Sequence, residues 1–188
     1  MNAKRHFLVG GGWALLATLG TANGALKSVL PPVEPARVAR VVDADTYDVV
    51  TGGQRVRVRL RGVDAPEHDQ AFGAQATDSV AALLPVGRRV QLRRHGVDRY
   101  GRTLGSLVLP PASGTGGRGA LDSLLVVRGW AWAYDPAHKV AGRAAQQAQA
   151  QAAGRGLWKC GAAAAVPPKV WRGFNYQNKR RYGAGCSW

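Results

Sequence analysis

Six charged side chains in three short stretches have the types and spacing that phosphate chemistry requires. They are Asp43, Asp45, Arg59, Asp64, Glu67 and Arg102, within residues 41–46, 58–67 and 98–102. Clustered carboxylates can hold a hard divalent cation, and a pair of guanidinium groups can grip a phosphate. The set therefore favours a metal-dependent phosphodiesterase.

The first two acids are Asp43 and Asp45, which point the same way if their segment is extended. Asp64 follows a predicted strand, and placing it against Asp45 opposes like charges, which is unfavourable without a cation between them. Because the donors are oxygens without nitrogen or sulfur, the set favours Ca²⁺, with Mg²⁺ as the second choice. Taken alone, the first pair also fits a solvated turn.

Glu67 follows Pro66, whose ring stiffens the turn and directs the carboxylate. A carboxylate at this place can position or deprotonate a water molecule for attack on phosphorus. The alternative is an exposed loop glutamate without a chemical role.

Arg59 lies near a strand end, shortly before Asp64, and Arg102 follows Gly101, which permits a close backbone approach. Planar guanidinium groups bind phosphate oxygens in pairs and offset the charge that grows in the transition state, a geometry that lysine does not reproduce. The neighbouring Arg55 and Arg57 fit a solvated basic face.

Short strands must position these residues. Residues 36–42 and 47–50 are β-like and flank the first acid pair, and residues 51–53 (Thr-Gly-Gly) are typical of a hairpin turn. Residues 54–60 alternate arginine with valine or leucine, which predicts a half-buried strand.

The remaining elements complete a small barrel. Strands are predicted at residues 89–92 and 103–109, and helices at residues 73–84, 121–128 and 137–153. Five short strands interrupted by helices predict an α+β, partly closed barrel, and such barrels bind oligonucleotides on an outer face.

The charge of the chain favours a polyanionic partner. The 188 residues include 26 basic and 11 acidic side chains, for a net charge of +15. An excess of this size matches nucleic acid, through phosphate contacts that release counterions. A basic protein without such a partner, or one drawn to anionic lipid, is the alternative.

The two ends carry further signals. Residues 1–25 have a positive start, an apolar run and small residues, as in a cleaved export signal, and residues 26–36 are a proline-rich linker. The run is short for a membrane span, so we expect a secreted or periplasmic protein; an uncleaved anchor is the alternative.

The two cysteines, Cys160 and Cys186, lie late in the chain. In an oxidising compartment an even pair suggests one disulfide, and two free thiols are the alternative. The four scattered histidines offer no spacing that suits zinc.

Across residues 37–158 the chain resembles the thermonuclease family, the staphylococcal-nuclease-like domains. The motifs are Val-Val-Asp-Ala-Asp-Thr, Arg-Leu-Arg-Gly-Val-Asp-Ala-Pro-Glu, Asp-Arg-Tyr-Gly-Arg, Val-Arg-Gly-Trp-Ala and Gly-Leu-Trp. The resemblance implies a five-stranded OB-fold β-barrel with three helices, Ca²⁺-dependent hydrolysis of DNA and RNA without preference for the sugar, and 3′-phosphate products. We expect a monomer.

The resemblance also implies a role for each matching residue. Asp45 and Asp64 match side-chain calcium ligands, Ala65 matches a residue that gives its carbonyl to the ion, and Asp43 matches a nearby acid. Glu67 matches the carboxylate proposed as general base. The substrate-side matches are the phosphate-binding Arg59 and Arg102, the substrate contacts Arg99 and Tyr100, and the nucleotide-flanking Tyr134.

Three departures from the family pattern stand out. Pro136 occupies the place of a second flanking tyrosine, residues 110–119 look like an insertion, and the basic, aromatic extension 159–188 lies outside the resemblance. Two competing readings of the whole chain remain: a catalytically inactive nucleic-acid-binding OB-fold module, and an envelope-anchored structural module.

Overall fold

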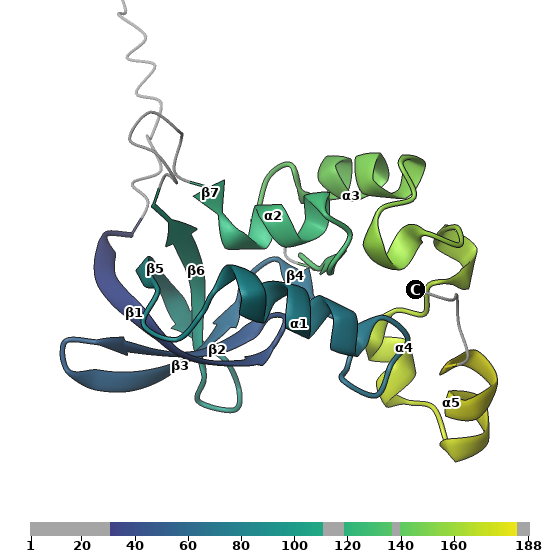
Figure 1. Cartoon of the computed structure of the whole chain (residues 1–188), viewed down its shortest axis with the longest axis horizontal. Coiled ribbons are helices and arrows are strands. Elements are labelled where there is room, and N and C mark those ends of the chain that lie inside the picture. Colours follow the sequence, from purple (N-terminus) through teal and green to yellow (C-terminus); the bar gives the residue numbers. More distant parts are fainter. Residues whose placement is uncertain (1–30, 111–118, 137–139, 184–188) are drawn as a thin grey trace, which may run out of the picture. The chain divides into compact units, whose positions relative to one another are not determined.

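The computed structural model describes residues 31–110, 119–136 and 140–183. Five strands form the barrel, and β3 closes it by pairing with β6 in addition to its neighbour β2. The barrel strands are β1 (Val33–Asp43), β2 (Thr46–Thr51), β3 (Gln54–Leu60), β5 (Arg89–Val97) and β6 (Thr103–Leu109). Figure 1 shows them curving around a common interior, with α1 crossing one side. The predicted five-stranded OB-fold barrel is confirmed.

Closure of the barrel depends on a residue without a side chain. At the seam β3 runs parallel to β6, with Leu60 beside Gly105. A Cβ on Gly105 would lie 2.9 Å from Leu92 Cδ1 and 3.0 Å from Val58 Cγ1. Glycine therefore lets β6 approach the buried side chains of its neighbours at this point.

The β2–β3 hairpin follows its turn chemistry. Gly52 and Gly53 both have positive φ, +54° and +77°, as a tight hairpin turn of the primed type requires. The register then pairs Thr46 with Arg59 and Tyr47 with Val58. This register brings Arg59 level with the turn that carries the first two acids.

Strand β1 begins at Val33, inside the segment predicted as a linker. Its first half pairs with β5 and its second half with β2. Pro35 lies in the first half, opposite Gln91. Because β1 pairs on one side only there, the missing N–H of proline is tolerated.

The core fills the barrel and continues under the helices. Val49, Val58, Leu92 and Leu107 are fully buried inside the barrel. Helices α1 (Gly73–Leu83) and α2 (Leu121–Val127) cover it, as predicted within one residue.

The predicted helix 137–153 was too long at its start, because helix α3 spans Arg143–Ala152. Gly142 precedes α3 with φ +81°, a left-handed conformation that a continuous helix excludes. Residues 137–139 lie outside the described residues.

Three short strands and two short helical turns connect these elements. They are β4 (Val63–Asp64), β7 (Gly119–Ala120), β8 (Trp132–Ala133), η1 (Gly156–Trp158) and η2 (Ala162–Ala164). Strand β4 pairs with β8, and this pairing sets Asp64 opposite Trp132.

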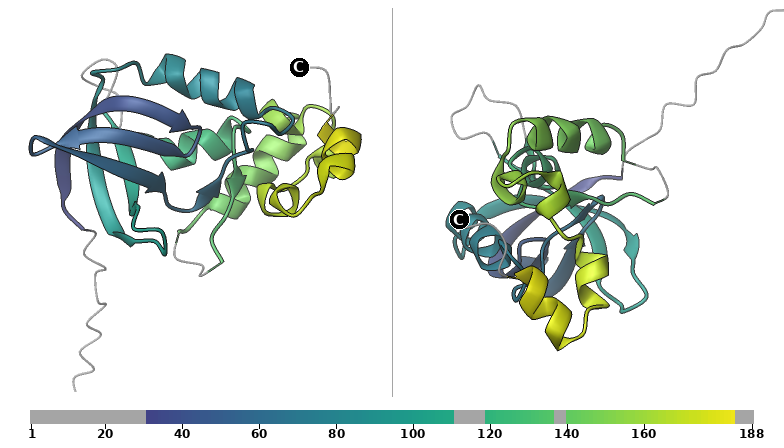
Figure 2. Two further views of the ribbon diagram at one scale, coloured as in Figure 1. Left: turned by 90° about the horizontal axis from the view of Figure 1, so that it is seen from below. Right: turned by 90° about the vertical axis from the view of Figure 1, so that its right-hand side faces the viewer.

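The C-terminal extension forms two further helices, α4 (Pro168–Arg172) and α5 (Tyr176–Gly183). The left view of Figure 2 shows them beyond one end of α1, away from the β2–β3 turn. No helix in the described part of the chain is long and apolar enough to cross a membrane. The predictions for residues 1–25, for 111–118 and for Cys186, with its disulfide, fall outside the described residues and stay predictions.

Candidate active site

All ten residues with a predicted role line one cleft of about 870 Å³. They are Asp43, Asp45, Arg59, Asp64, Ala65, Glu67, Arg99, Tyr100, Arg102 and Tyr134. They come from the β1–β2 turn, the end of β3, β4 and the loop after it, the β5–β6 turn, and the segment after β8. The barrel therefore brings together segments that are distant in the sequence.

Arg59 joins the two central acids. Its Nη1 lies 3.2 Å from Asp45 Oδ2, and its Nη2 donates to Asp64 Oδ1 at 2.8 Å. Nη1 also donates to the backbone carbonyls of Leu60 and Val63, at 3.1 and 2.9 Å. The Arg59 side chain is only 14% exposed, so this guanidinium is fixed in place.

Arg59 thus differs from the other arginines of its strand. Arg55 and Arg57 are more than half exposed and pair with Asp48, as a solvated basic face predicts. The register places Arg59 at the strand end, where the chain turns back at Gly62 with φ +81°.

Of the two central acids, Asp45 is held by a backbone N–H and a side-chain hydroxyl. Asp45 Oδ2 accepts a hydrogen bond of 2.6 Å from the Ala65 N–H, and Asp45 Oδ1 accepts one of 3.0 Å from the Thr46 hydroxyl. Asp45 and Asp64 are 6% and 4% exposed. Both residues are therefore largely buried, and Arg59 contacts both carboxylates.

Burial and like charge raise the pKa of two acids here. For Asp64 burial is the largest cause of the raised pKa, Arg59 counteracts it, and the charge of Asp45 adds to it. Burial also raises the pKa of Asp43, with further contributions from Asp45 and Glu67. A cluster that resists ionisation in this way is one that a bound cation would stabilise.

The acids of the cleft are oxygen donors, the kind of ligand that a hard divalent cation prefers. Among residues 31–110, 119–136 and 140–183, no group of three or more His, Cys, Asp or Glu side chains can hold a metal ion by itself. Asp45 and Asp64 are a smaller, all-oxygen pair, and the resemblance implies the carbonyl of Ala65 as a third donor. Such a set suits Ca²⁺ or Mg²⁺ when water completes the coordination.

Glu67 projects from the loop between β4 and α1 and is more exposed, at 37% for its side chain. Its N–H donates to Gln70 Oε1 at 3.1 Å, and its carbonyl accepts from the Gln70 N–H at 2.9 Å. A Cβ on Gly73 would lie 1.8 Å from the Glu67 carbonyl oxygen. The start of α1 can lie against this loop because Gly73 has no side chain.

The β5–β6 turn presents Arg102. Asp98 Oδ2 accepts a hydrogen bond of 2.6 Å from Arg102 Nε, and its Oδ1 accepts from the N–H groups of Tyr100 and Arg102. Burial raises the pKa of Asp98, but these hydrogen bonds outweigh burial and lower it overall. Gly101 supports the turn with φ +76°.

Two aromatic rings line the opening of the cleft. Tyr100 is 67% exposed, with the guanidinium carbons of Arg99 and Arg102 at 4.8 and 5.5 Å from its ring centroid. Tyr134 is 45% exposed, and its N–H donates to the Gly62 carbonyl. Pro136, where the resemblance implies a second tyrosine, lines the same cleft.

The sequence reasoning gave no role to several charged residues of the cleft, among them Asp98, which holds Arg102, and Arg172. Arg172, at the end of α4, contacts both Glu67 and Asp64. The only signal in the sequence was the basic character of the extension, which assigned no position to any of its arginines.

The closed five-stranded barrel, with acids and arginines gathered in one cleft, is the architecture of an OB-fold domain of the nuclease type. Over residues 57–160, more than half of its length, the chain matches the family described as staphylococcal nuclease homologue, and it belongs to that family.

Three relatives illustrate the match. The micrococcal nuclease of Shigella flexneri is 45% identical over 100 residues, which are 52% of this chain and 56% of that protein. An uncharacterized endonuclease of Escherichia coli is 35% identical, covering 72% of this chain and 83% of its own length. Protein ParB of Escherichia coli is 37% identical, covering 77% and 81%. The chain thus spans little more than half of the Shigella relative.

Proposed function

We propose that this protein is a nuclease that hydrolyses phosphodiester bonds of DNA and RNA with Ca²⁺ as its cofactor. The observation that carries the proposal is Arg59, which joins Asp45 and Asp64 in a cleft that also holds Glu67 and Arg102. The names of the nuclease relatives support the same activity.

The carboxylates of Asp45 and Asp64, with the carbonyl of Ala65 and with Asp43 nearby, would hold the divalent cation. When bound, this ion supplies Lewis-acid polarisation of the scissile phosphate. The raised pKa values of Asp43 and Asp64 are the physical reason to expect a cation at these acids.

Glu67 acts as general base in this proposal. It accepts a proton from water as the water oxygen bonds to phosphorus, and the P–O5′ bond breaks with its electron pair leaving on the 5′-oxygen, which solvent protonates. The products carry a 3′-phosphate and a 5′-hydroxyl.

Arg59 and Arg102 stabilise the charge that accumulates on the non-bridging oxygens. Arg59 is fixed before substrate arrives, and Asp98 holds Arg102 at the cleft wall. Donors that are already in place lose little energy in reorganisation during the reaction.

Arg99, Tyr100 and Tyr134 bind the substrate strand. Exposed tyrosine rings stack on bases of any sequence, which suits a nuclease that accepts both sugars. The net charge of +15 draws nucleic acid to the protein. The pattern of residues 1–25 supports export, so we place the activity, carried by a monomer, in the periplasm or outside the cell.

The test is digestion of single- and double-stranded DNA and RNA by the purified protein, with Ca²⁺ or with EGTA, followed by analysis of the product ends. We expect cleavage of all substrates with Ca²⁺, none with EGTA, and 3′-phosphate ends. Glu67→Gln and Arg102→Ala should each reduce turnover by about 10²-fold or more.

Two outcomes would contradict the proposal. A salt-sensitive gel shift without loss of substrate in Ca²⁺ would favour the inactive nucleic-acid-binding module. Full activity in EGTA would remove the cation from the reaction.

A further inference from the structure

Among the described residues of the C-terminal extension, Arg172 is the one that lines the cleft. Its Nη1 lies 2.5 Å from Glu67 Oε1, and its Nη2 lies 3.2 Å from Asp64 Oδ2. The Arg172 side chain is half exposed and lines the same cleft as Arg59 and Arg102. A segment outside the family match therefore contacts two of the acids with proposed roles.

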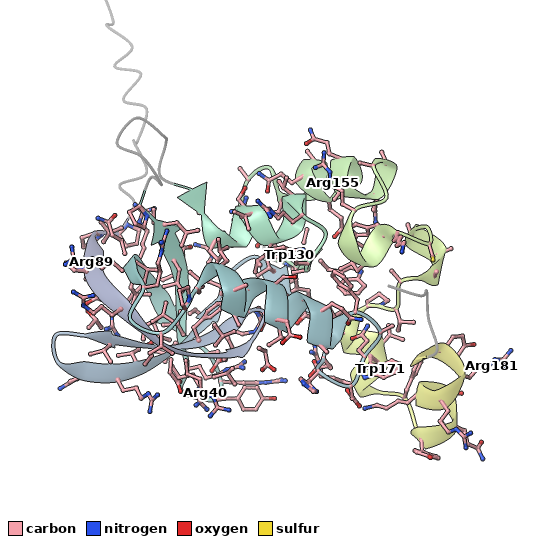
Figure 3. The ribbon with its side chains drawn as sticks, in the orientation of Figure 1. Arg40, Arg89, Trp130, Arg155, Trp171 and Arg181 are labelled. Carbon is pink, nitrogen blue, oxygen red and sulfur yellow. The ribbon has the colours of Figure 1, made fainter. Side chains whose placement is uncertain are left out.

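The extension is anchored beside the loop that carries Glu67. Trp171 is 1% exposed, and its indole N–H donates to Asp69 Oδ1 at 2.9 Å. Lys179 from α5 contacts the other oxygen of Asp69 at 2.7 Å. Figure 3 labels Trp171 where α4 meets the segment that leads into α1. Because Arg172 follows Trp171 directly, burial of the Trp171 ring fixes the backbone position from which the Arg172 side chain extends.

Gln70 forms a second connection between the loop and the extension. Its Nε2 donates to the Val166 carbonyl at 2.5 Å, and its Oε1 accepts from the Glu67 N–H at 3.1 Å. One buried amide thus connects the backbone of Glu67 to the backbone of the extension. The extension contacts Glu67 both through its side chain and, by way of Gln70, through its main chain.

The two helices of the extension share a small aromatic cluster around the anchor. Phe174 lies 6.0 Å from Trp171 and 5.3 Å from Tyr182, between ring centroids. A Cβ on Gly183 would lie 3.0 Å from Trp171 Cη2, so α5 packs closely against the same ring. Arg172 therefore projects from a helix that packs, through Trp171, against α5.

Glu67 needs such a partner more than the other acids do. Asp45 accepts a backbone hydrogen bond, and Asp64 lies in a paired strand, whereas Glu67 projects from a loop and is 37% exposed. Arg172 binds Oε1 of Glu67. An ion pair to one carboxylate oxygen limits the rotamers of the side chain and leaves the second oxygen to accept a proton from water.

We propose that Arg172 is a positioning residue of the active site, which holds Glu67 in the orientation that the hydrolytic step requires. The helices α4 and α5 are then a working part of the enzyme. This inference rests on the proposed nuclease function and adds a residue to its site.

The first experiment compares steady-state kinetics of Arg172→Ala, Arg172→Lys and Arg181→Ala with the wild-type protein in Ca²⁺. Arg181 is the matched control because it belongs to the same extension, is exposed, and does not line the cleft; its guanidinium carbon lies 5.5 Å from the ring centroid of its neighbour Tyr182. We expect Arg172→Ala to reduce kcat about 10- to 100-fold with KM within about threefold, and Arg172→Lys to restore part of the loss. Arg181→Ala should stay within about twofold of wild type.

A double-mutant cycle separates positioning from a general structural role. In a Glu67→Gln background, Arg172→Ala should change the rate by less than about twofold, because the group that it positions is already disabled. An equal loss in both backgrounds would overturn the inference. Wild-type inactivity would instead refute the proposed nuclease function, so the two failures are distinguishable.

A binding measurement in EGTA supplies a readout that does not depend on turnover. A fluorescein-labelled oligonucleotide should bind Arg172→Ala and wild type with affinities within about threefold, because the arginine acts through Glu67. A loss of affinity of tenfold or more would make Arg172 a phosphate contact and overturn the positioning role. Circular dichroism confirms folding, and Arg172→Gln replaces the alanine variant if that variant does not fold.

Discussion

Asp64 contacts an arginine through each carboxylate oxygen, and the two arginines come from different regions of the molecule. Oδ1 accepts from Arg59 of the barrel, and Oδ2 contacts Arg172 of the C-terminal extension. The Arg59 side chain is 14% exposed and that of Arg172 is 50% exposed. The same acid is therefore neutralised once by a rigid partner and once by an accessible one.

The difference lies in how each region fixes its arginine. Strand β3 pairs with β2 on one side and β6 on the other, so Arg59 cannot leave its place unless the closed sheet opens. Arg172 depends on a five-residue helix in which only Pro168 and Trp171 are buried. Regions anchored by few buried contacts open locally at lower free energy than the core does. We expect loss of the barrel contacts to abolish the site, and loss of the extension contacts to reduce the turnover of a site that is still formed.

The largest effect should come from Arg59→Ala. Its removal leaves Asp45 and Asp64 buried against each other, so turnover should fall about 10³-fold. In EGTA the free energy of unfolding should fall by about 3–5 kcal/mol, because the buried Asp45 loses its arginine and Asp64 keeps only Arg172. Urea denaturation and kinetics measure the two effects.

Arg57→Ala is the control for this change, since Arg57 lies two residues earlier on the same strand with a side chain that is 51% exposed. It should leave the free energy of unfolding nearly unchanged, because solvent screens the exposed ion pair of Arg57 with Asp48. An Arg59→Ala protein within tenfold of wild-type turnover would refute the rigid, essential role of the barrel arginine.

The next effect separates the stabilities of the two regions. Leu107→Ala removes a fully buried barrel side chain and should lower the global free energy of unfolding by about 2–5 kcal/mol. Trp171→Ala should instead expose the amides of α4 and α5 to rapid hydrogen exchange while the barrel changes by less than about 1 kcal/mol. An equal global loss from Trp171→Ala would mean that barrel and extension unfold as one unit.

A third prediction uses pH, which should act on the two regions with opposite sign in metal-free protein. Hydrogen bonds from Lys179 and Trp171 lower the pKa of Asp69 below its ordinary 3.8. The unfolded extension therefore binds more protons near this pH, so stabilisation of the extension is full above about pH 3.8 and is lost as pH falls through the folded pKa.

Asp64 behaves in the opposite way, because burial raises its pKa above 3.8. Its contribution to stability is full below that pH and is lost as pH rises through the folded pKa. NMR in EGTA can follow the indole N–H signal of Trp171 as the pH falls. This signal should change, as its hydrogen bond to Asp69 breaks, before the signals of the barrel amides change. Asp69→Asn should abolish this pH dependence, and an indole signal that is insensitive to pH in wild type would count against the anchor.

The smallest effect should come from Lys179→Gln. Lys179 and Asp69 are 33% and 58% exposed, so their ion pair should contribute only about 0.2–1 kcal/mol to docking of the extension. Raising the salt concentration should reduce the difference between wild type and variant in hydrogen exchange of α5. Lys179 Nζ also lies 5.2 Å from the centroid of the Trp171 ring, and a larger, salt-independent effect would show that Lys179 acts through this ring.

The barrel was largely predictable because its signals are local. The alternation of residues predicted the bounds of β3, and the two glycines after β2 predicted the turn between these strands. The acids and arginines of the site were predicted from the spacing of the motifs. The site of Arg172 was not predictable, because a five-residue helix has no period to detect. Its anchor joins Trp171 to Asp69 across 102 positions of sequence, and such a contact appears only after the chain has folded.

The cleft also extends past both ends of the segment that identifies the family. Residues 57–160 begin inside β3 and stop before α4. A fragment trimmed to that segment would carry Arg59, Glu67 and Arg102 yet lack Asp43, Asp45 and Arg172. The segment that matches the family and the segment that contains the complete site therefore have different bounds. A transfer of the proposed activity to another protein should include the residues on both sides of the family match.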